Sequence, residues 1–385
     1  MMRSLSLAAR RDADGVFTFP APDRPAGQRS VLGLRTEPIE CLRVGFVGLG
    51  LRGPTAVERF THIEGVRIAA LCDVDPERVE AAQRILADRN LPAAAAYTGA
   101  EGWRRLCERD DVDLVYVCTP WDSHTPIALY AMEQGRHVAV EVPAATSLAE
   151  CWALVDTAER TQRHCMMLEN CIYDLFALTT LRMAQEGVLG DLLHVEGAYI
   201  HPFDTWERWR LEFNRRRRGD LYATHGLGPA CQLLDIHRGD RLDYLVAVDT
   251  PAVGGSAAAG RQTGDPSFAN GDQTSTLLRT VRGRTVSLQH NVATPRPYSR
   301  RYQVVGSEGF AEKYPASTPF RRAGSPNSFP TARSAGPTNI SPRRCGARSR
   351  SGSATRSPPR WARSGPGGST PCARASTSEW TTVWS

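Results

Sequence analysis

Lysine is almost absent from this sequence. Of the 47 lysine and arginine residues among its 385 residues, only Lys313 is a lysine. A lysine base or a lysine Schiff base is therefore excluded for residues 1–312. Any proton transfer in that part of the chain must use histidine, tyrosine, cysteine or an acidic side chain.

Long hydrophobic runs are also missing. No run approaches the roughly 18 apolar residues that a membrane-spanning helix needs. Near the N-terminus, residues 5–9 form the only apolar stretch, which is too short for the core of a secretory signal. Arg10-Arg11 resembles a twin-arginine signal only weakly, because Asp12 and Asp14 follow. We therefore expect a cytoplasmic protein that contacts no membrane, with its ten cysteines as reduced thiols.

Acidic residues almost disappear from the last seventy positions. Residues 316–385 contain 11 arginines and one acid, Glu379, whereas residues 1–315 carry 36 basic and 40 acidic residues. The main body is mildly acidic, so it offers no basic face for nucleic acid. The tail has too few apolar residues to bury a core. Two interpretations stay open: a disordered basic tail, or translation of a GC-rich gene out of frame after about residue 315.

Strands and helices alternate in residues 41–164. Short apolar runs predict strands at 42–47, 66–72, 112–118 and 137–140, and polar, periodic segments predict helices at 76–88 and 125–134. This alternation indicates an α/β fold with a doubly wound parallel sheet, the Rossmann architecture. We expect residues 1–40 to be a loose leader.

The pattern changes from about residue 165. A helix at 175–186 is followed by strands with few helices between them, at 193–200, 242–248, 274–282, 285–292, 302–305 and 310–312. This order predicts a second, α+β domain over residues 165–315, built on a mostly antiparallel sheet.

A glycine-rich loop links the first predicted strand to a helix. Gly48, Gly50 and Gly53 have the G-x-G-x-x-G spacing. In that context the first glycine allows a tight turn, the second lets the backbone approach a pyrophosphate, and the third lets helix and strand pack. Asp73 ends the second strand, where an acid binds the adenosine ribose and repels a 2′-phosphate. The pattern predicts NAD as the cofactor, in preference to NADP.

Polar segments follow two further parallel strands. Residues 119–124 come after one strand, and Glu141-Val142-Pro143 comes after the next. Ligands bind at the carboxyl ends of such strands. Each segment alone would equally suit a turn with a helix cap, but the two together favour a site.

These features resemble the Gfo/Idh/MocA group of sugar-handling oxidoreductases. Ordinary members have Glu-Lys-Pro where this chain has Glu141-Val142-Pro143, and the lysine assists proton transfer. The second domain sharpens the resemblance, over about residues 41–315, to glycoside hydrolase family 109. The segments that carry it are Glu169-Asn170-Cys171-Ile172-Tyr173, residues 196–201, Trp209-Arg210, residues 221–229, residues 238–245 and residues 294–299.

That resemblance implies an α-N-acetylgalactosaminidase that keeps NAD bound. Hydride would leave C3 of the sugar, a base would remove the C2 proton, the aglycone would leave from C1, and water addition and hydride return would complete hydrolysis without net redox change. Such a reaction lies outside the usual two-carboxylate mechanism of glycosidases. A small sugar or glycoside is then the expected partner, and homo-oligomers are common in the family.

The resemblance also implies roles for individual residues. Tyr173 and His225 are the candidates for proton transfer, since histidine has a suitable pKa near neutrality. Besides the glycines, the implied NAD contacts are Leu51, Arg52, Asp73, Trp121, Asp122, Ser123, His124, Glu141, Val142 and Asn170. The implied sugar contacts are Tyr199, Arg210, Tyr222, Ala223, Thr224, His225 and Tyr298.

Some features depart from the family pattern. Ala223 stands where a proline is usual, and the family's C-terminal portion is absent in frame. Two alternatives therefore stay open. The chain could be a net NAD-dependent sugar dehydrogenase, or an NAD-binding protein inactivated by its altered C-terminus. Val142 is evidence against the dehydrogenase, because it stands in place of the lysine of ordinary members.

Overall fold

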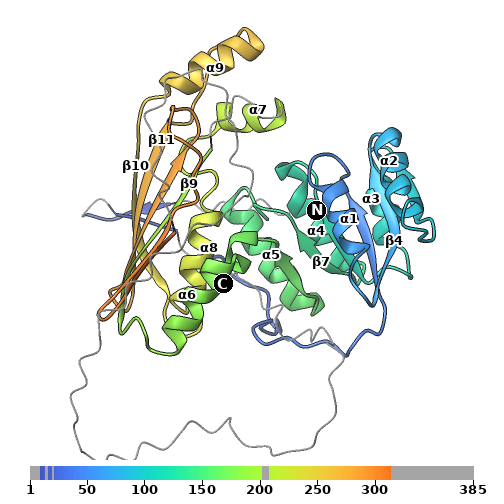
Figure 1. The fold of residues 1–385 in the computed structure, drawn as a ribbon, viewed down its shortest axis with the longest axis horizontal. Helices are drawn as coiled ribbons and strands as arrows, with labels where there is room; N and C mark the ends of the chain where they lie inside the picture. Colours follow the sequence, from blue (N-terminus) through green and yellow to red (C-terminus); the bar gives the residue numbers. More distant parts are fainter. Residues whose placement is uncertain (1–8, 14–15, 20, 202–207, 314–385) are drawn as a thin grey trace, which may run out of the picture.

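The computed structural model describes residues 9–13, 16–19, 21–201 and 208–313 (Figure 1). The two interpretations of residues 316–385 lie outside the described residues, as do residues 1–8. Within the described part, two six-stranded sheets each form the centre of a domain, and a two-stranded hairpin of β1 (Arg10–Arg11) and β2 (Phe17–Thr18) precedes them. None of the described helices is both long and apolar enough to cross a membrane.

The first sheet is entirely parallel and confirms the predicted Rossmann architecture. Its spatial order is β5-β4-β3-β6-β7-β8, the doubly wound order in which the chain reverses direction between β3 and β6. The strands are β3 (Leu42–Val47), β4 (Val66–Asp73), β5 (Ala95–Thr98), β6 (Leu114–Val117), β7 (His137–Val140) and β8 (Cys165–Met167).

Five helices flank this sheet (Figure 1): α1 (Gly53–Phe60), α2 (Pro76–Ala87), α3 (Gly102–Cys107), α4 (Trp121–Glu133) and α5 (Leu148–Thr161). Local sequence sets where they begin. The Asp75 side chain accepts a hydrogen bond from Glu77 N at the start of α2, and Ser147 does the same for Glu150 N at α5. The helices bury β3 and β6, where Phe46 stacks on Tyr116 with ring centroids 5.1 Å apart.

The second sheet is mostly antiparallel, as predicted. Its order is β10-β11-β12-β9-β13-β14, and only the β12–β9 pair is parallel. The strands are β9 (Leu192–Ile200), β10 (Leu242–Asp249), β11 (Gln273–Thr280), β12 (Thr285–Asn291), β13 (Tyr302–Gly306) and β14 (Phe310–Lys313). The helical elements are η1 (Asn170–Tyr173), α6 (Leu175–Gln185), α7 (Arg208–Arg216), α8 (Thr224–Leu233) and α9 (Val253–Thr263).

Helix α8 lies unusually close to the second sheet. It crosses β9 where Gly197 meets Gly226, and a Cβ at position 197 would lie 2.5 Å from the Gly226 Cα. Only a pair of glycines permits this approach. In Figure 1, α6 and α8 cover the face of the sheet that looks toward the first domain. The first turn of α8 is thereby held at the boundary between the two domains.

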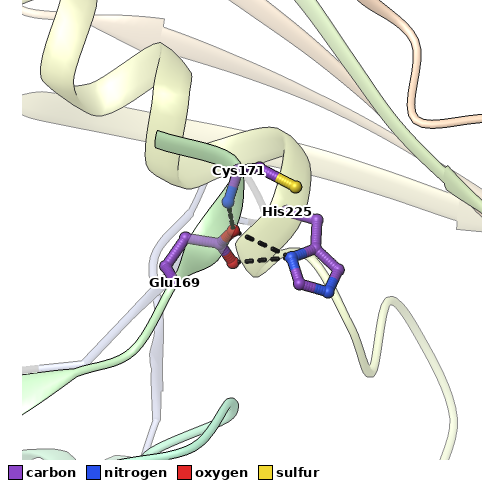
Figure 2. A group of neighbouring side chains, drawn as sticks. All are labelled: Glu169, Cys171 and His225. Carbon is purple, nitrogen blue, oxygen red and sulfur yellow. Dashed lines mark hydrogen bonds and ion pairs between the residues drawn. The ribbon is translucent and has the colours of Figure 1, made fainter. Parts of the chain in front are cut away.

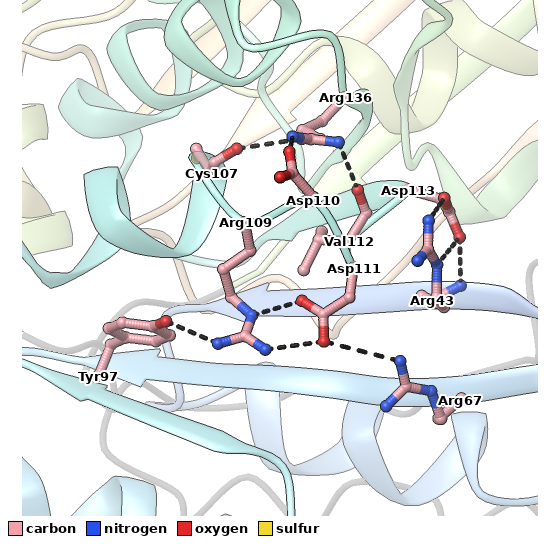
Figure 3. A network of polar contacts seen from close by, with 10 residues as sticks. All are labelled: Arg43, Arg67, Tyr97, Cys107, Arg109, Asp110, Asp111, Val112, Asp113 and Arg136. Atoms are coloured by element: carbon pink, nitrogen blue, oxygen red, sulfur yellow. Dashed lines mark hydrogen bonds and ion pairs between the residues drawn. The ribbon is translucent and has the colours of Figure 1, made fainter.

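A polar network holds the edge of the first sheet at which its parallel strands begin (Figure 3). Arg43 donates two side-chain hydrogen bonds to Asp113, at 2.9 and 2.6 Å. Arg136 donates to the carbonyl oxygens of Cys107 and Val112, both at 3.1 Å. These contacts hold the chain that enters β6, at the edge away from the carboxyl ends of the strands.

The segment expected to be a loose leader makes specific contacts with the first domain. Arg24 Nε donates to Asp156 on α5 at 2.9 Å, and its guanidinium lies 5.6 Å from the Trp152 ring centroid. Val31 is only 7% exposed. It lines a small crevice with residues of α5 and β8, among them Leu154 and Met167.

Candidate active site

The glycine loop has the shape that a dinucleotide requires. Gly48 has a φ of 92°, and a Cβ there would lie 2.7 Å from the Cys118 carbonyl carbon. At Gly53 a Cβ would overlap the Gly48 carbonyl oxygen. At Gly50, by contrast, the only neighbour of a Cβ among the described residues would be the Arg78 guanidinium, 3.2 Å away. The outer side of the loop is therefore open to a pyrophosphate at the start of α1, and the residues present fit NAD.

Asp73 connects this loop to the predicted ribose site. It ends β4, and its side chain is buried. One carboxylate oxygen accepts from Leu49 N at 2.6 Å, and the other accepts from Asp75 N at 3.0 Å. A carboxylate offers about four lone-pair positions, so positions remain for ribose hydroxyls.

The loops after β6 and β7 are tied together by His124. Its ring is 1% exposed, with Nδ1 2.8 Å from the Pro143 carbonyl oxygen and Nε2 2.7 Å from the Thr119 carbonyl oxygen. Ser123 Oγ donates to the Pro120 carbonyl oxygen at 2.7 Å. The His124 side chain therefore shapes the two loops from behind, and its predicted NAD contact stays a prediction.

Glu141 directly follows β7, and its side chain is half-buried. It accepts a hydrogen bond from the Tyr116 hydroxyl at 3.1 Å. Burial raises the pKa of its carboxyl, against the lowering effects of Tyr116 and Arg52. The next residue, Val142, is 6% exposed and brings no titratable group to the place where the resemblance expects a lysine.

An aromatic cluster joins the two domains. Tyr199, from the end of β9, lies with its ring centroid 4.6 Å from that of Tyr222 and 5.2 Å from that of His225. Trp121, at the start of α4 in the first domain, lies 5.4 Å from Tyr222. The Arg210 guanidinium lies 5.5 Å from the Trp121 ring centroid and 5.7 Å from that of Tyr222. Five of the predicted site residues are thus brought together.

His225 is paired with an acid that the sequence analysis gave no role. Its Nδ1 lies 2.8 Å from both oxygens of Glu169, as Figure 2 shows. The two side chains are only 3% and 0% exposed. Glu169 follows β8, so it obeys the same rule that singled out Asp73 and Glu141 at strand ends. The signal was missed because the three-residue strand β8 was not predicted.

Cys171 and Arg300 extend this group. The Cys171 N–H donates to Glu169 at 2.6 Å, and Arg300 Nη1 lies 3.2 Å from the Cys171 sulfur. Glu169, Cys171 and His225 place one potential metal-ligand atom each within 4.8 Å of the others. Burial raises the pKa of the Cys171 thiol to about 11, so the sulfur stays protonated beside a guanidinium. That chemistry suits a hydrogen-bond network better than a cation.

A second buried pair supports the cluster from behind. His290 Nδ1 lies 3.6 Å from Asp220, and the His290 ring stacks near Tyr199 with centroids 6.1 Å apart. Burial raises the pKa of Asp220 to about 6 and lowers that of His290 to about 3. Neither residue was predicted as part of the site, because nothing in the local sequence pattern distinguishes them.

The remaining predicted residues lie around this centre. Tyr173 is 53% exposed on η1, which packs against α8. The Tyr298 ring lies 5.5 Å from that of His201, which in turn stacks on Tyr199. Leu51, Arg52, Asp122 and Asn170 are exposed, and Ala223 and Thr224 are half-buried at the start of α8.

Family models match both domains. Residues 42–169 match the oxidoreductase family with the NAD-binding Rossmann fold, and residues 203–331 match the C-terminal domain of glycosyl hydrolase 109. An aldose-aldose oxidoreductase from Caulobacter crescentus has a similar structure, with a TM-score of 0.57, 25% identity, and coverage of 71% of this chain and 76% of that chain. A scyllo-inositol dehydrogenase from Lactobacillus casei, solved with NAD(H) and scyllo-inositol, has a TM-score of 0.57 at 15% identity over 71% of this chain and 76% of that chain.

The fold and the glycine loop thus define an NAD-binding protein of the Gfo/Idh/MocA type. Glycosyl hydrolase family 109 protein 1 of Bacteroides fragilis is 60% identical over 304 residues, which are 77% of this chain and 66% of the relative. A family 109 protein of Porphyromonas gingivalis is 58% identical over 322 residues, covering 81% and 69% of the two chains. This chain belongs to glycosyl hydrolase family 109, and it spans about two thirds of the length of these relatives.

Proposed function

We propose that this protein hydrolyses α-N-acetylgalactosaminides, using bound NAD without net redox change. The observation that carries the proposal is the buried Glu169–His225 pair beside Tyr199, in a family 109 chain whose only lysine is Lys313. The pair offers a proton-transfer group next to the edge of the sheet where the glycine loop fits NAD.

The chemistry divides between cofactor and chain. When bound, NAD supplies reversible hydride acceptance at C3 of the sugar. The C3 hydroxyl proton passes to a base as the hydride leaves, and the resulting ketone acidifies the C2 proton. Loss of the C2 proton to a base, with the aglycone leaving from C1 and taking up a proton, gives a C1–C2 double bond. Water then adds across this bond, its hydroxyl to C1 and its proton to C2, and return of the hydride to C3 and of a proton to its oxygen restores the alcohol. We assign the proton transfers to Nε2 of His225, because Nδ1 is engaged by Glu169, and to the hydroxyl of Tyr173.

The aromatic cluster would bind and orient the sugar. Tyr222 and Tyr199 carry flat apolar rings, a type of surface on which a pyranose ring packs well, and both rings are buried against their neighbours in this cluster. Arg210 and Tyr298 would donate hydrogen bonds to its polar substituents. Glu141, Trp121 and Arg52 would contact NAD from the first domain.

A net sugar dehydrogenase is the second candidate, and the fold it shares with inositol dehydrogenases favours it. Val142 weighs against it, since it replaces the lysine of ordinary members. Lys313 does not replace that lysine, because its ammonium lies 2.7 Å from the Asp174 carboxylate at the start of α6. A third candidate is an NAD-binding protein without turnover.

One assay separates the three. Purified full chain, checked for bound NAD, is incubated with 4-nitrophenyl α-N-acetylgalactosaminide while nitrophenol release and NADH absorbance are followed together. We expect nitrophenol without net NADH, and its loss in His225→Asn. Accumulating NADH would favour a dehydrogenase, and bound NAD without either product would favour the third candidate.

We propose the cytoplasm as the compartment. The eight cysteines among the described residues are all free thiols, which suits a reducing environment. A sugar or glycoside is the proposed partner, and a homo-oligomer is compatible with the family.

A further inference from the structure

We propose that Glu169 is the positioning residue of His225, holding the proton on Nδ1 so that Nε2 is the atom that exchanges protons with the sugar. The inference rests on the proposed function, in which His225 moves a proton, and it adds a residue to which the sequence pattern gave no role.

The geometry of the pair is that of a carboxylate holding one imidazole tautomer. Nδ1 of His225 lies 2.8 Å from each Glu169 oxygen. A carboxylate in its ionised form only accepts hydrogen bonds, so Nδ1 must carry the hydrogen. In a neutral ring the other nitrogen, Nε2, is then unprotonated and can accept a proton.

The surrounding backbone fixes Glu169 in this position. Its own N–H donates to the Met167 carbonyl oxygen at 3.0 Å, and the Cys171 N–H donates to its side chain at 2.6 Å. Across the contact, a Cβ at Gly228 on α8 would lie 2.8 Å from Glu169 Cγ. Gly228 lies three residues after His225 on the same helix. Because it has no side chain, it leaves the space that the Glu169 side chain fills.

The charges around the pair keep Glu169 ionised and His225 neutral. Burial lowers the pKa of His225, Arg300 and Arg52 lower it further, and Glu169 opposes them. Burial alone would raise the pKa of Glu169, but the hydrogen bonds that its carboxylate accepts from His225 and from the Cys171 N–H reverse the direction. Other titratable groups near the pair are Tyr199 and Tyr222, whose pKa values burial raises, and the protonated Cys171 thiol. The two tyrosines and the thiol are neutral near pH 7. Burial raises the pKa of Glu141, and the charge of Glu169 raises it further.

The first test is the pH dependence of Glu169→Gln. We expect kcat to fall by about 10²-fold or more, as expected when a positioned proton-transfer group loses its orientation, with KM changed less than threefold. Loss of the negative charge should move the acidic limb of kcat/KM to lower pH. Glu169→Asp should recover part of kcat, because it restores the charge but shortens the reach. An unchanged kcat and acidic limb in Glu169→Gln would overturn the proposal.

Asp240→Asn is the matched control. Its carboxylate is likewise 0% exposed, and it accepts from Arg241 N at 2.8 Å, away from the site. We expect it to lower the melting temperature but to leave the pH profile in place. A similar profile shift in this control would reduce Glu169 to a structural role.

The second test needs no turnover. In ¹⁵N-labelled protein, with the His225 signals assigned by comparison with His225→Asn, two-bond ¹H–¹⁵N correlations should show the Nδ1–H tautomer in the full chain and its loss in Glu169→Gln. Detection of Nε2–H in the unsubstituted protein would refute the positioning role. A wild-type chain with the Nδ1–H tautomer but no glycosidase activity would refute the proposed function alone.

Discussion

Replacing Gly50 with alanine separates cofactor binding from folding in the glycine loop. Its φ is not in the left-handed region, and within the described part of the chain the only neighbour of an added Cβ is the far end of the Arg78 side chain, 3.2 Å away. Arg78 is half-exposed and can move. The free energy of unfolding should therefore stay within about 0.5 kcal/mol of its original value.

NAD affinity should respond differently. The pyrophosphate has to approach the backbone at the second glycine of the loop, and a methyl group there occupies that space. We expect NAD to bind at least tenfold more weakly, about 1.4 kcal/mol. Gly53→Ala is the contrasting variant, because its methyl group would overlap the Gly48 carbonyl oxygen inside the fold. Overpacking of this kind costs about 1–3 kcal/mol of stability.

Two measurements on NAD-stripped protein decide the matter. Thermal unfolding without NAD should be unchanged in Gly50→Ala and several degrees lower in Gly53→Ala, and titration calorimetry should give the NAD dissociation constant of each. Wild-type affinity in Gly50→Ala would refute the assignment of the pyrophosphate to this side of the loop. A fall in the melting temperature of Gly50→Ala as large as that of Gly53→Ala would refute the claim that Gly50 serves cofactor binding and not folding.

Three further predictions concern stability. Burial lowers the pKa of His290 to about 3, so below about pH 6.5 the unfolded chain binds a proton that the folded protein does not bind. The free energy of unfolding should therefore fall by up to about 1.4 kcal/mol per pH unit on acidification. In urea unfolding at pH 7, 6 and 5, His290→Gln should lose less of this free energy than the original protein, and an equal pH dependence in the two proteins would contradict the burial argument. Gly197→Ala should cost about 1–3 kcal/mol, because its Cβ would lie 2.5 Å from the Gly226 Cα, and an unchanged urea midpoint would show that α8 can move away from β9. Val31→Ala removes two buried methyl groups and should lower the free energy of unfolding by about 1–2 kcal/mol. Phe17→Ser changes a side chain that is 61% exposed and should alter that free energy by less than about 0.5 kcal/mol. Equal urea midpoints for the two variants would show that the segment around Val31 is loose.

The Rossmann domain was largely predictable because its signals are local. Continuous apolar runs such as 42–47 identified β3 to the residue, and the glycine spacing located the turn after it. The predicted helix at 125–134 began late, since α4 begins at Trp121. Trp121 enters the helix because its ring packs against Phe213 and Tyr222 of the second domain, which no local pattern reveals.

The candidate site was less accessible to sequence reasoning. Helix α8 contains Gly226, Gly228 and Pro229, which have low intrinsic helix propensity, so it was not predicted even though His225 lies on it. Its helical state depends on packing against β9 and β12. The same long-range packing brings Glu169 to His225 across 56 positions of sequence, which only the fold itself can reveal.

The hydrogen bond from Leu49 N to Asp73 has a consequence for protein engineering. The acid expected to select NAD also fastens the glycine loop, so cofactor preference and loop shape share one carboxylate. Exchange of Asp73 for a neutral residue, the usual first step toward accepting NADP, would leave the buried Leu49 N–H without its partner. A redesign of the preferred nucleotide would therefore have to replace two functions of Asp73 at once, its repulsion of a 2′-phosphate and its hydrogen bond to the glycine loop.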